Sequence, residues 1–318
     1  MVSEPALSRQ PPPGDTVCPF QLDGEPVRGR IARMGASTLD PILKRHAYDT
    51  ELARLLGEAL LLASLVGSAM KFQGRVMVQA EGNGPVSLLA AEYTVDGSMR
   101  GYVRRDRDKW AKLTRINRGT RPHMPQLFGA KGILGLIIIH DDPSMQPYQG
   151  VVPLERGTLA ECAEDYFRRS EQVETRIALA VGELSHPGQS DSATWRGGAM
   201  MIQQVAGDDA RGDTGDAWQA AEAIFATLTD GELLSPDISQ DALLYRLFHE
   251  TGVRKGAPQP LIDACSCTEE RLRATLQGLS DDGLRELVEP DGTLSIHCQF
   301  CNRHYTIPLK EVTGPTAS

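Results

Sequence analysis

Four of the six cysteines form the pattern that most constrains what this chain can fold into. They read C-x-C, then 30 intervening residues, then C-x-x-C, at Cys265, Cys267, Cys298 and Cys301. In an extended segment residues i and i+2 point to the same side, so Cys265 and Cys267 can address one point in space. Cys298 and Cys301 have the two-residue spacing common in zinc knuckles and ribbons. The C-terminal segment is therefore predicted to fold around one shared four-thiol centre.

Four thiolates would complete a tetrahedral shell with no open position for water. We therefore expect one structural zinc ion per chain, held by Cys265, Cys267, Cys298 and Cys301, and this closed shell argues against a zinc hydrolase. His297 and His304 flank the second cysteine pair. Because four thiols already fill the shell, both histidines are expected to lie at the surface or beyond the ligands.

Neither the N-terminal sequence nor the apolar stretches indicate export or a membrane. The N-terminal sequence MVSEPALSRQPPPGD is polar and proline-rich, without the apolar region of a secretory signal. The longest apolar stretch, residues 59–70, is shorter than the ~20 residues that span a bilayer, and a buried helix is predicted there. We expect a soluble, cytoplasmic protein without a membrane partner, and permanent disulfides are rare in that compartment.

Three other interpretations of the cysteines compete with a switchable zinc site. Unrelated buried cysteines poorly explain two close pairs in one short polar segment. The reducing compartment disfavours structural disulfides. A permanent zinc ion without a redox role remains an alternative, because spacing does not distinguish it from a switch.

Zinc would give these cysteines a redox chemistry. The metal holds each ligand as a thiolate, the form that reacts with oxidants, so oxidation of a pair removes two ligands and expels the metal. A structural zinc ion can contribute ~10–16 kcal/mol of apparent binding free energy, and a segment as short as 265–318 has little core of its own. Oxidation is therefore expected to unfold the segment.

Charged side chains are distributed unevenly along the 318 residues. Residues 1–205 carry 24 basic and 23 acidic side chains, residues 206–264 carry 4 and 11, and residues 265–318 carry 5 and 8. These nets of +1, −7 and −3 sum to −9. Since Lys and Arg supply most of the affinity for a phosphate backbone, no nucleic-acid partner is expected.

Composition and charge predict four parts. Residues 1–20 are expected to be a flexible tail, residues 21–205 an α+β core domain, residues 206–264 an acidic helical linker and residues 265–318 the zinc-binding domain. The linker opens with the glycine- and aspartate-rich sequence GDDARGDTGD. Two short amphipathic helices should follow, the second capped by Ser239, and their apolar faces contain Trp218, Ala221, Phe225, Leu228, Leu243, Leu244, Leu247 and Phe248.

Hydrophobic periodicity in the core domain predicts a mixture of sheet and helix rather than repeated βαβ units. Thr158 and Glu161 have the spacing of a helix capping box. Helices are expected over residues 40–71 and 159–170. Strands are expected over residues 27–33, 75–79, 86–93, 99–103, 133–140, 148–153, 177–181 and 199–205.

With these residues in place, the sequence resembles the heat shock protein 33 family, the redox-regulated 33 kDa chaperonins of bacteria. The resemblance covers nearly the whole chain. It is specific because several similar stretches occur in the family's order, together with the C-x-C and C-x-x-C pairs. The resembling stretches are VRGRIARM, LKRHAYDTELARLLGEALLLASL, MKFQGRVMVQAEGNGPVSLLAAE, YQGVVPLERGTLAECAEDYFRRSEQVETR, GGAMMIQQV, LLYRLFHE, CSC and EPDGTLSIHCQFCNRHY.

The resemblance implies an ATP-independent holdase that binds unfolding client proteins and is inactive while reduced and zinc-bound. Carried onto this chain, the family's pattern pairs Cys265 with Cys267 and Cys298 with Cys301 on oxidation. Zinc then leaves, the linker loosens, and the reduced monomer becomes an oxidised homodimer. Cys162 looks like a position outside the switch, and Cys18 matches no motif of the family. The longer N-terminus and the GDDARGDTGD loop depart from the family's pattern.

Two other classes of function compete with a chaperone. An enzyme is not expected, because the sequence contains no P-loop, G-x-S-x-G or H-E-x-x-H motif. A constitutive zinc-ribbon adaptor would share the metal but not the redox response, so its function should be insensitive to mild oxidation.

Overall fold

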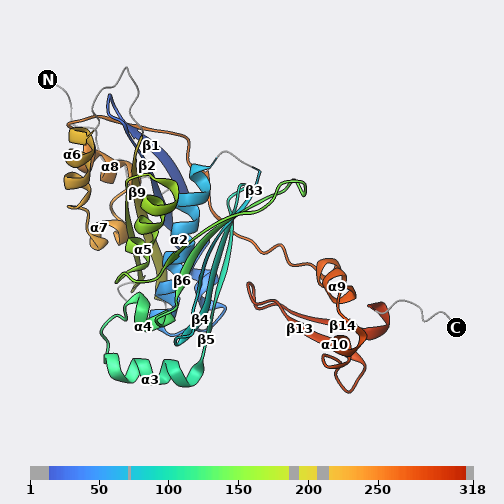
Figure 1. Cartoon of the computed structure of the whole chain (residues 1–318). Helices are drawn as coiled ribbons and strands as arrows, with labels where there is room; N and C mark the ends of the chain where they lie inside the picture. The colour runs from blue at the N-terminus through green and yellow to red at the C-terminus, as the bar shows by residue number, and fades with distance from the viewer. Residues whose placement is uncertain (1–13, 71–72, 186–192, 206–214, 313–318) are drawn as a thin grey trace. The chain divides into compact units, whose positions relative to one another are not determined.

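The computed structural model describes residues 14–70, 73–185, 193–205 and 215–312. It divides into two compact units, Met1–Asp263 (unit 1) and Ala264–Ser318 (unit 2), each of which is described by itself (Figure 1). The first 13 residues of the expected tail and most of the expected GDDARGDTGD loop lie outside the described residues. The mixed α+β class predicted from the sequence is confirmed.

A long apolar helix, α2 (Thr50–Ala69), forms the centre of unit 1. The side chain of Asp49 caps it by accepting a hydrogen bond of 3.2 Å from the backbone N–H of Leu52. By length and composition α2 could cross a membrane, but 83% of its most apolar window is buried inside the structure, as in the core helix of a soluble protein. The single helix predicted over residues 40–71 is two helices, because the chain breaks between α1 (Leu39–Lys44) and α2, where Ala47 has a φ of 48°.

Two sheets pack against α2, and the strand pairs within them are antiparallel except for one. The first sheet has the order β10-β1-β2-β9-β8, with β11 beside β1. Its strands are β1 (Thr16–Leu22), β2 (Val27–Met34), β8 (Thr175–Leu184), β9 (Thr194–Gln204), β10 (Val253–Lys255) and β11 (Gln259–Pro260).

The second sheet has the order β12-β5-β4-β3-β6-β7, and its parallel pair joins β12 to β5. The strands predicted over residues 75–79, 86–93 and 99–103 lie within β3, β4 and β5, which pair in sequence order as an antiparallel meander. Its strands are β3 (Gly74–Glu81), β4 (Val86–Thr94), β5 (Ser98–Arg105), β6 (Ile133–His140), β7 (Tyr148–Pro153) and β12 (Ile262–Asp263).

The first sheet is buried on both faces. Alternate side chains of a strand point to opposite sides, so β1, β2, β8 and β9 each contribute to two apolar clusters. Ala32 and Met34 of β2 belong to the core around α2, whereas Ile31 belongs to a second apolar cluster on the outer face. Three helices cover that outer face: α6 (Gly215–Phe225), α7 (Asp230–Leu234) and α8 (Gln240–Phe248) (Figure 1). The segment expected to be a separate linker therefore packs on unit 1 over its described residues 215–263.

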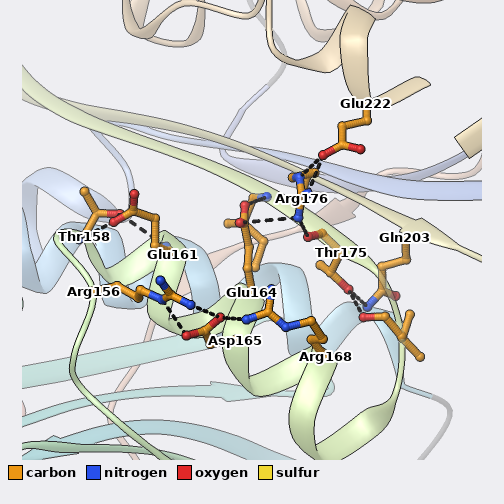
Figure 2. A network of polar contacts seen from close by, with 12 residues as sticks. Arg156, Thr158, Glu161, Glu164, Asp165, Arg168, Thr175, Arg176, Gln203 and Glu222 are labelled. Carbon is orange, nitrogen blue, oxygen red and sulfur yellow. Dashed lines mark hydrogen bonds and ion pairs between the residues drawn. The ribbon is translucent and has the colours of Figure 1, made fainter. Parts of the chain in front are cut away.

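The remaining helices of unit 1 lie at the ends and edges of the sheets. α3 (Arg107–Asn117) and α4 (Met124–Phe128) follow β5, and α5 (Leu159–Tyr166) continues into a π-helical turn at Phe167–Glu171. Thr158 and Glu161 form the predicted capping box at the start of α5. Figure 2 shows the polar network of this region, in which Asp165 binds Arg156 and Arg168.

The expectation of a flexible tail through residue 20 is wrong from Thr16 onward, because Thr16–Leu22 is β1, in the interior of the first sheet. Strand β1 contains Pro19, and a proline cannot donate a hydrogen bond to a strand ladder. β1 accommodates Pro19 because its neighbour on that side is interrupted: β11 pairs with Thr16 and Val17, and β10 pairs with residues 20–22. The Pro19 carbonyl accepts a hydrogen bond from Gly256 N–H in the gap.

Unit 2 is a small hairpin with two short helices. α9 (Glu269–Gln277) and α10 (Asp281–Arg285) precede the strands β13 (Thr293–His297) and β14 (His304–Pro308), which end in a 3-10 turn at Leu309–Glu311. The buried apolar cluster contains Leu276, Leu284, Leu294, Ile307 and Val312. So few buried side chains supply limited hydrophobic stabilisation, and a unit of this size commonly needs a further stabilising element, such as a metal ion.

Candidate metal centre

Two backbone features bring the cysteine pairs of unit 2 together. Cys265 and Cys267 lie in the segment that enters α9, whose N-cap is Thr268. Cys298 and Cys301 lie in the turn between β13 and β14, where the Cys298 N–H donates to the Arg303 carbonyl at 2.9 Å. Asn302 has a φ of 57°, a left-handed conformation that asparagine tolerates better than most residues. The turn therefore directs both sulfurs toward the first pair.

The four cysteine sulfurs all lie within 4.8 Å of one another, and the arrangement can hold a metal ion. Sγ of Cys265 lies 3.8 Å from Sγ of Cys298, and Sγ of Cys267 lies 3.2 Å from Sγ of Cys301. Among the residues that the structure describes, no other cluster of His, Cys, Asp and Glu side chains has this convergence. None of the six cysteines, all of which lie in the described residues, forms a disulfide bond.

Electrostatics at the centre favours a cation. Burial would raise the pKa of Cys267, but hydrogen bonds from Tyr305 and from the other three cysteines lower it to about 7. Burial and the hydrogen bond with Cys267 raise the pKa of Cys301 to about 12, because a thiol that donates to a neighbouring thiolate holds its proton more tightly. A divalent cation among the sulfurs would take the place of that proton and allow all four to be thiolates.

The neighbouring histidines do not belong to the four-sulfur group. They are exposed cross-strand partners whose ring centroids lie 4.5 Å apart with the ring planes tilted by 35°, and His304 Nε2 lies 2.8 Å from Ser295 Oγ. Their expected place outside the ligand set agrees with this geometry.

Tyr305 is the residue of the centre that the sequence did not reveal. Its hydroxyl lies 3.2 Å from Sγ of Cys267 and 3.2 Å from the Cys267 carbonyl oxygen, and Arg303 Nη1 lies 3.4 Å from the same hydroxyl. A tyrosine four positions after a cysteine in a strand carries no metal-site signal. The Tyr305 hydroxyl and the Cys267 sulfur meet only because β14 pairs with β13 and the segment that contains Cys267 lies beside this hairpin.

Cys18 and Cys162 lie in unit 1, within strand β1 and helix α5. Both are fully buried. Burial raises the pKa of each thiol, that of Cys162 to about 11, and Cys18 Sγ donates to Oε1 of Gln240 at 3.2 Å. Thiols with raised pKa values in apolar surroundings react slowly with oxidants.

Comparisons with known proteins agree with this architecture. A family profile described as Hsp33 protein matches residues 15–308. A 33 kDa chaperonin of Caulobacter vibrioides (strain NA1000 / CB15N) is 45% identical over 298 residues, covering 92% of this chain and 94% of the relative. A 33 kDa chaperonin of Pseudomonas paraeruginosa (strain DSM 24068 / PA7) is 36% identical over 296 residues, covering 92% and 91%.

A solved structure gives independent support for the fold. The crystal structure of a 33 kDa chaperonin from Thermotoga maritima superposes with a TM-score of 0.74 at 24% identity, covering 93% of this chain and 96% of that one. The profile match and the identities over almost the full length of these relatives establish the family, and their names support a chaperone function. The chain belongs to the Hsp33 family.

Proposed function

We propose that this protein is a redox-regulated, ATP-independent holdase of the cytoplasm, inactive while reduced and zinc-bound. The observation that carries the proposal is the convergence of four cysteine sulfurs in a unit with few buried apolar side chains, within a chain of the Hsp33 family. Its partners would be unfolding client proteins. The relatives are named chaperonins rather than enzymes, which fits the expectation that this protein has no enzymatic activity.

Zinc suits the donor set better than other common metals. Four soft sulfur ligands without carboxylates favour zinc or an iron–sulfur cluster, and a single tetrahedral zinc with ligands at about 2.3 Å would place its sulfurs about 3.8 Å apart. The distances of 3.8 and 3.2 Å and the limit of 4.8 Å fit one central ion. Cys265, Cys267, Cys298 and Cys301 would hold it, and the ion would supply the charge that keeps all four as thiolates.

The redox step would use two thiolates at a time. Two thiolates and two protons reduce one hydrogen peroxide to two waters and form one S–S bond, so each such step removes two ligands from the metal. We propose the pairs Cys265–Cys267 and Cys298–Cys301. Two of the sulfur contacts join one pair to the other, Cys265–Cys298 at 3.8 Å and Cys267–Cys301 at 3.2 Å. Once the metal leaves, however, sequence proximity gives near neighbours the higher effective concentration.

Loss of the zinc-dependent fold would then loosen the covering segment α6–α8. The chain links α8 to unit 2 through the short strands β10, β11 and β12, and Cys265 follows β12 by two residues. Residues 206–264 carry 4 basic and 11 acidic side chains, a charge that would keep the exposed segment soluble. The apolar surface uncovered on α6–α8 would bind clients and a second subunit, so we propose a monomer when reduced and a homodimer when oxidised.

An aggregation assay with a thermally unfolding client tests this function. Matched reduced and oxidised samples are compared for client light scattering, zinc content and molecular mass. The oxidised protein should suppress aggregation, lose zinc and dimerise, and reductant with zinc should reverse all three changes. Peptide mapping of the oxidised sample should find near-neighbour disulfides, and mainly cross-pair disulfides would refute the pairing. Equal activity in both samples would favour the constitutive zinc adaptor.

Tyr305 should slow zinc release, because its hydroxyl can donate to the thiolate of Cys267 and reduce its nucleophilicity. We expect Tyr305→Phe to release zinc about 3- to 10-fold faster under peroxide, measured with a chelating dye. Tyr245→Phe, which removes an exposed hydroxyl of α8, is the matched control. Identical release rates for the two variants would show that the Tyr305 contact has no role at the centre.

A further inference from the structure

Two arginines of the first sheet point to its outer face, beneath the covering helices. Arg33 lies in β2, and Arg196 lies in the neighbouring strand β9. Both reach toward the turn between α7 and α8 rather than into solvent, and Arg33 is 8% exposed. A buried arginine in a sheet needs partners for its donors, and the partners here belong to the covering segment.

The partners are backbone carbonyl oxygens at the end of α7 and in the turn that follows. Arg33 Nη1 donates to the carbonyls of Ser235, at 3.1 Å, and of Ile238, and its Nη2 donates to the Glu232 carbonyl at 3.0 Å. Arg196 Nη2 donates to the Ser235 carbonyl at 3.3 Å. The last carbonyls of a helix have no partner within the helix, so these two side chains supply donors to carbonyls that are only partly exposed to water.

The backbone of β9 lets α7 approach closely enough for these contacts. A Cβ at residue 198 would collide with the carbonyl oxygen of Leu233, so α7 lies directly on Gly198. Gly198 is two residues from Arg196 and faces Arg33 across the β2–β9 ladder. The two arginines and the glycine therefore form one docking point for the α7–α8 turn.

The charge at this point comes from two neighbouring guanidinium groups. Within the described ranges neither arginine forms an ion pair, although Asp15 and Asp237 are close enough to act on Arg196 through space. Burial, and then the nearby Arg196 cation, lower the pKa of Arg33 to about 10. The guanidinium charges are balanced mainly by carbonyl dipoles, and both cations would regain hydration if the segment left the sheet.

A second polar contact between the sheet and the covering segment is a partly exposed ion pair. Arg176 of β8 binds Glu222 of α6 through Nε at 2.6 Å, and its Nη1 lies 3.7 Å from Glu164 of α5 (Figure 2). The side chains of Arg176 and Glu222 are 31% and 33% exposed. Solvent weakens such pairs, whereas loss of Arg33 would remove the side-chain donor from three half-buried carbonyls at once.

We propose that Arg33 and Arg196 are positioning residues that clamp the α7–α8 turn to the sheet and set how readily the segment α6–α8 leaves it. The clamp depends on geometry, because one planar guanidinium reaches three carbonyls that a single ammonium cannot reach together. The effect of the clamp on docking of α6–α8 is independent of the proposed function, whereas its effect on chaperone activity rests on that function.

Amide hydrogen exchange of the reduced, full-length protein tests the clamp. Arg33→Met and Arg33→Lys should both speed exchange in α7 and α8 by about 10- to 100-fold, with α2 unchanged. Arg196→Met, which removes one hydrogen bond, should give a smaller change of about 3- to 10-fold and serves if Arg33→Met fails to fold. Arg28→Met, an exposed position of the same strand, is the matched control and should behave as the parent.

Two results would overturn the clamp. One is exchange in α7 and α8 that stays at the parent's rate in Arg33→Met, or in Arg196→Met if the first variant does not fold. The other is parental exchange in Arg33→Lys, which would show that charge alone suffices. In an aggregation assay, reduced Arg33→Met should protect a client partially while its zinc is retained. If the oxidised parent protects no client, the proposed function fails, and the exchange result still decides the clamp.

Discussion

Replacing Cys298 with Ser is expected to empty the metal centre and unfold unit 2 in the reduced protein. Cys298 Sγ is one of four sulfurs within 4.8 Å of one another, and a hydroxyl is a poor zinc ligand beside three thiolates. Among the described residues of the unit, five buried apolar side chains form its cluster, whereas a structural zinc ion contributes ~10–16 kcal/mol. Metal analysis should show zinc largely lost, and hydrogen exchange should show β13 and β14 unprotected.

The other two cysteines supply the controls. Cys18→Ala and Cys162→Ala remove thiols that are buried in unit 1, within β1 and α5. Both variants should keep the zinc content of the parent, whatever they cost in stability. Full zinc occupancy in a variant that lacks both Cys298 and Cys301 would show that the metal is held elsewhere.

The sequence predicted the parts of the fold whose patterns are local. The apolar run at residues 133–140 is β6, the alternation at 27–33 is β2, and the capping pair Thr158 and Glu161 starts α5. Each of these signals depends on neighbouring residues of one element, so no tertiary information was needed.

Elements that were missed depend on partners distant in the sequence. β1 contains Pro19, and it is a strand because β2 pairs with one side of it while β10 and β11 share the other. α3 buries only Trp110 and Leu113 among many charged residues, so its apolar periodicity is weak. β12 has two residues and exists through its parallel pairing with β5.

The candidate site shows the same division. Spacing alone named the four cysteines that converge, because the ligands of a small metal centre come from short local motifs. Tyr305 approaches Cys267 only after the hairpin and the N-terminal end of α9 meet, and Arg33 meets its carbonyls only after α7 lies on Gly198. Contacts of side chains with backbone carbonyls leave no pattern in a sequence.

Introducing a carboxylate at Leu247 should give the reduced, zinc-bound protein part of the chaperone activity of the oxidised form. Leu247 is 5% exposed in α8 and belongs to the apolar cluster that joins the segment α6–α8 to the first sheet. An unpaired carboxylate there costs several kcal/mol, which favours release of the segment over docking. Hydrogen exchange should accelerate over α6–α8 while zinc content stays at one ion per chain.

The matched control is Tyr245→Asp, which places the same charge on the same helix at a side chain that is 68% exposed. It should leave both exchange and client aggregation at the level of the reduced parent, so a difference between the two variants reports burial rather than added charge. If Leu247→Asp loosened α6–α8 yet left the client as unprotected as the reduced parent does, release of the segment would not be the activating step. The chaperone surface would then have to arise from unit 2 or from dimerisation itself, because apolar area exposed on α6–α8 would have proved insufficient to hold a client.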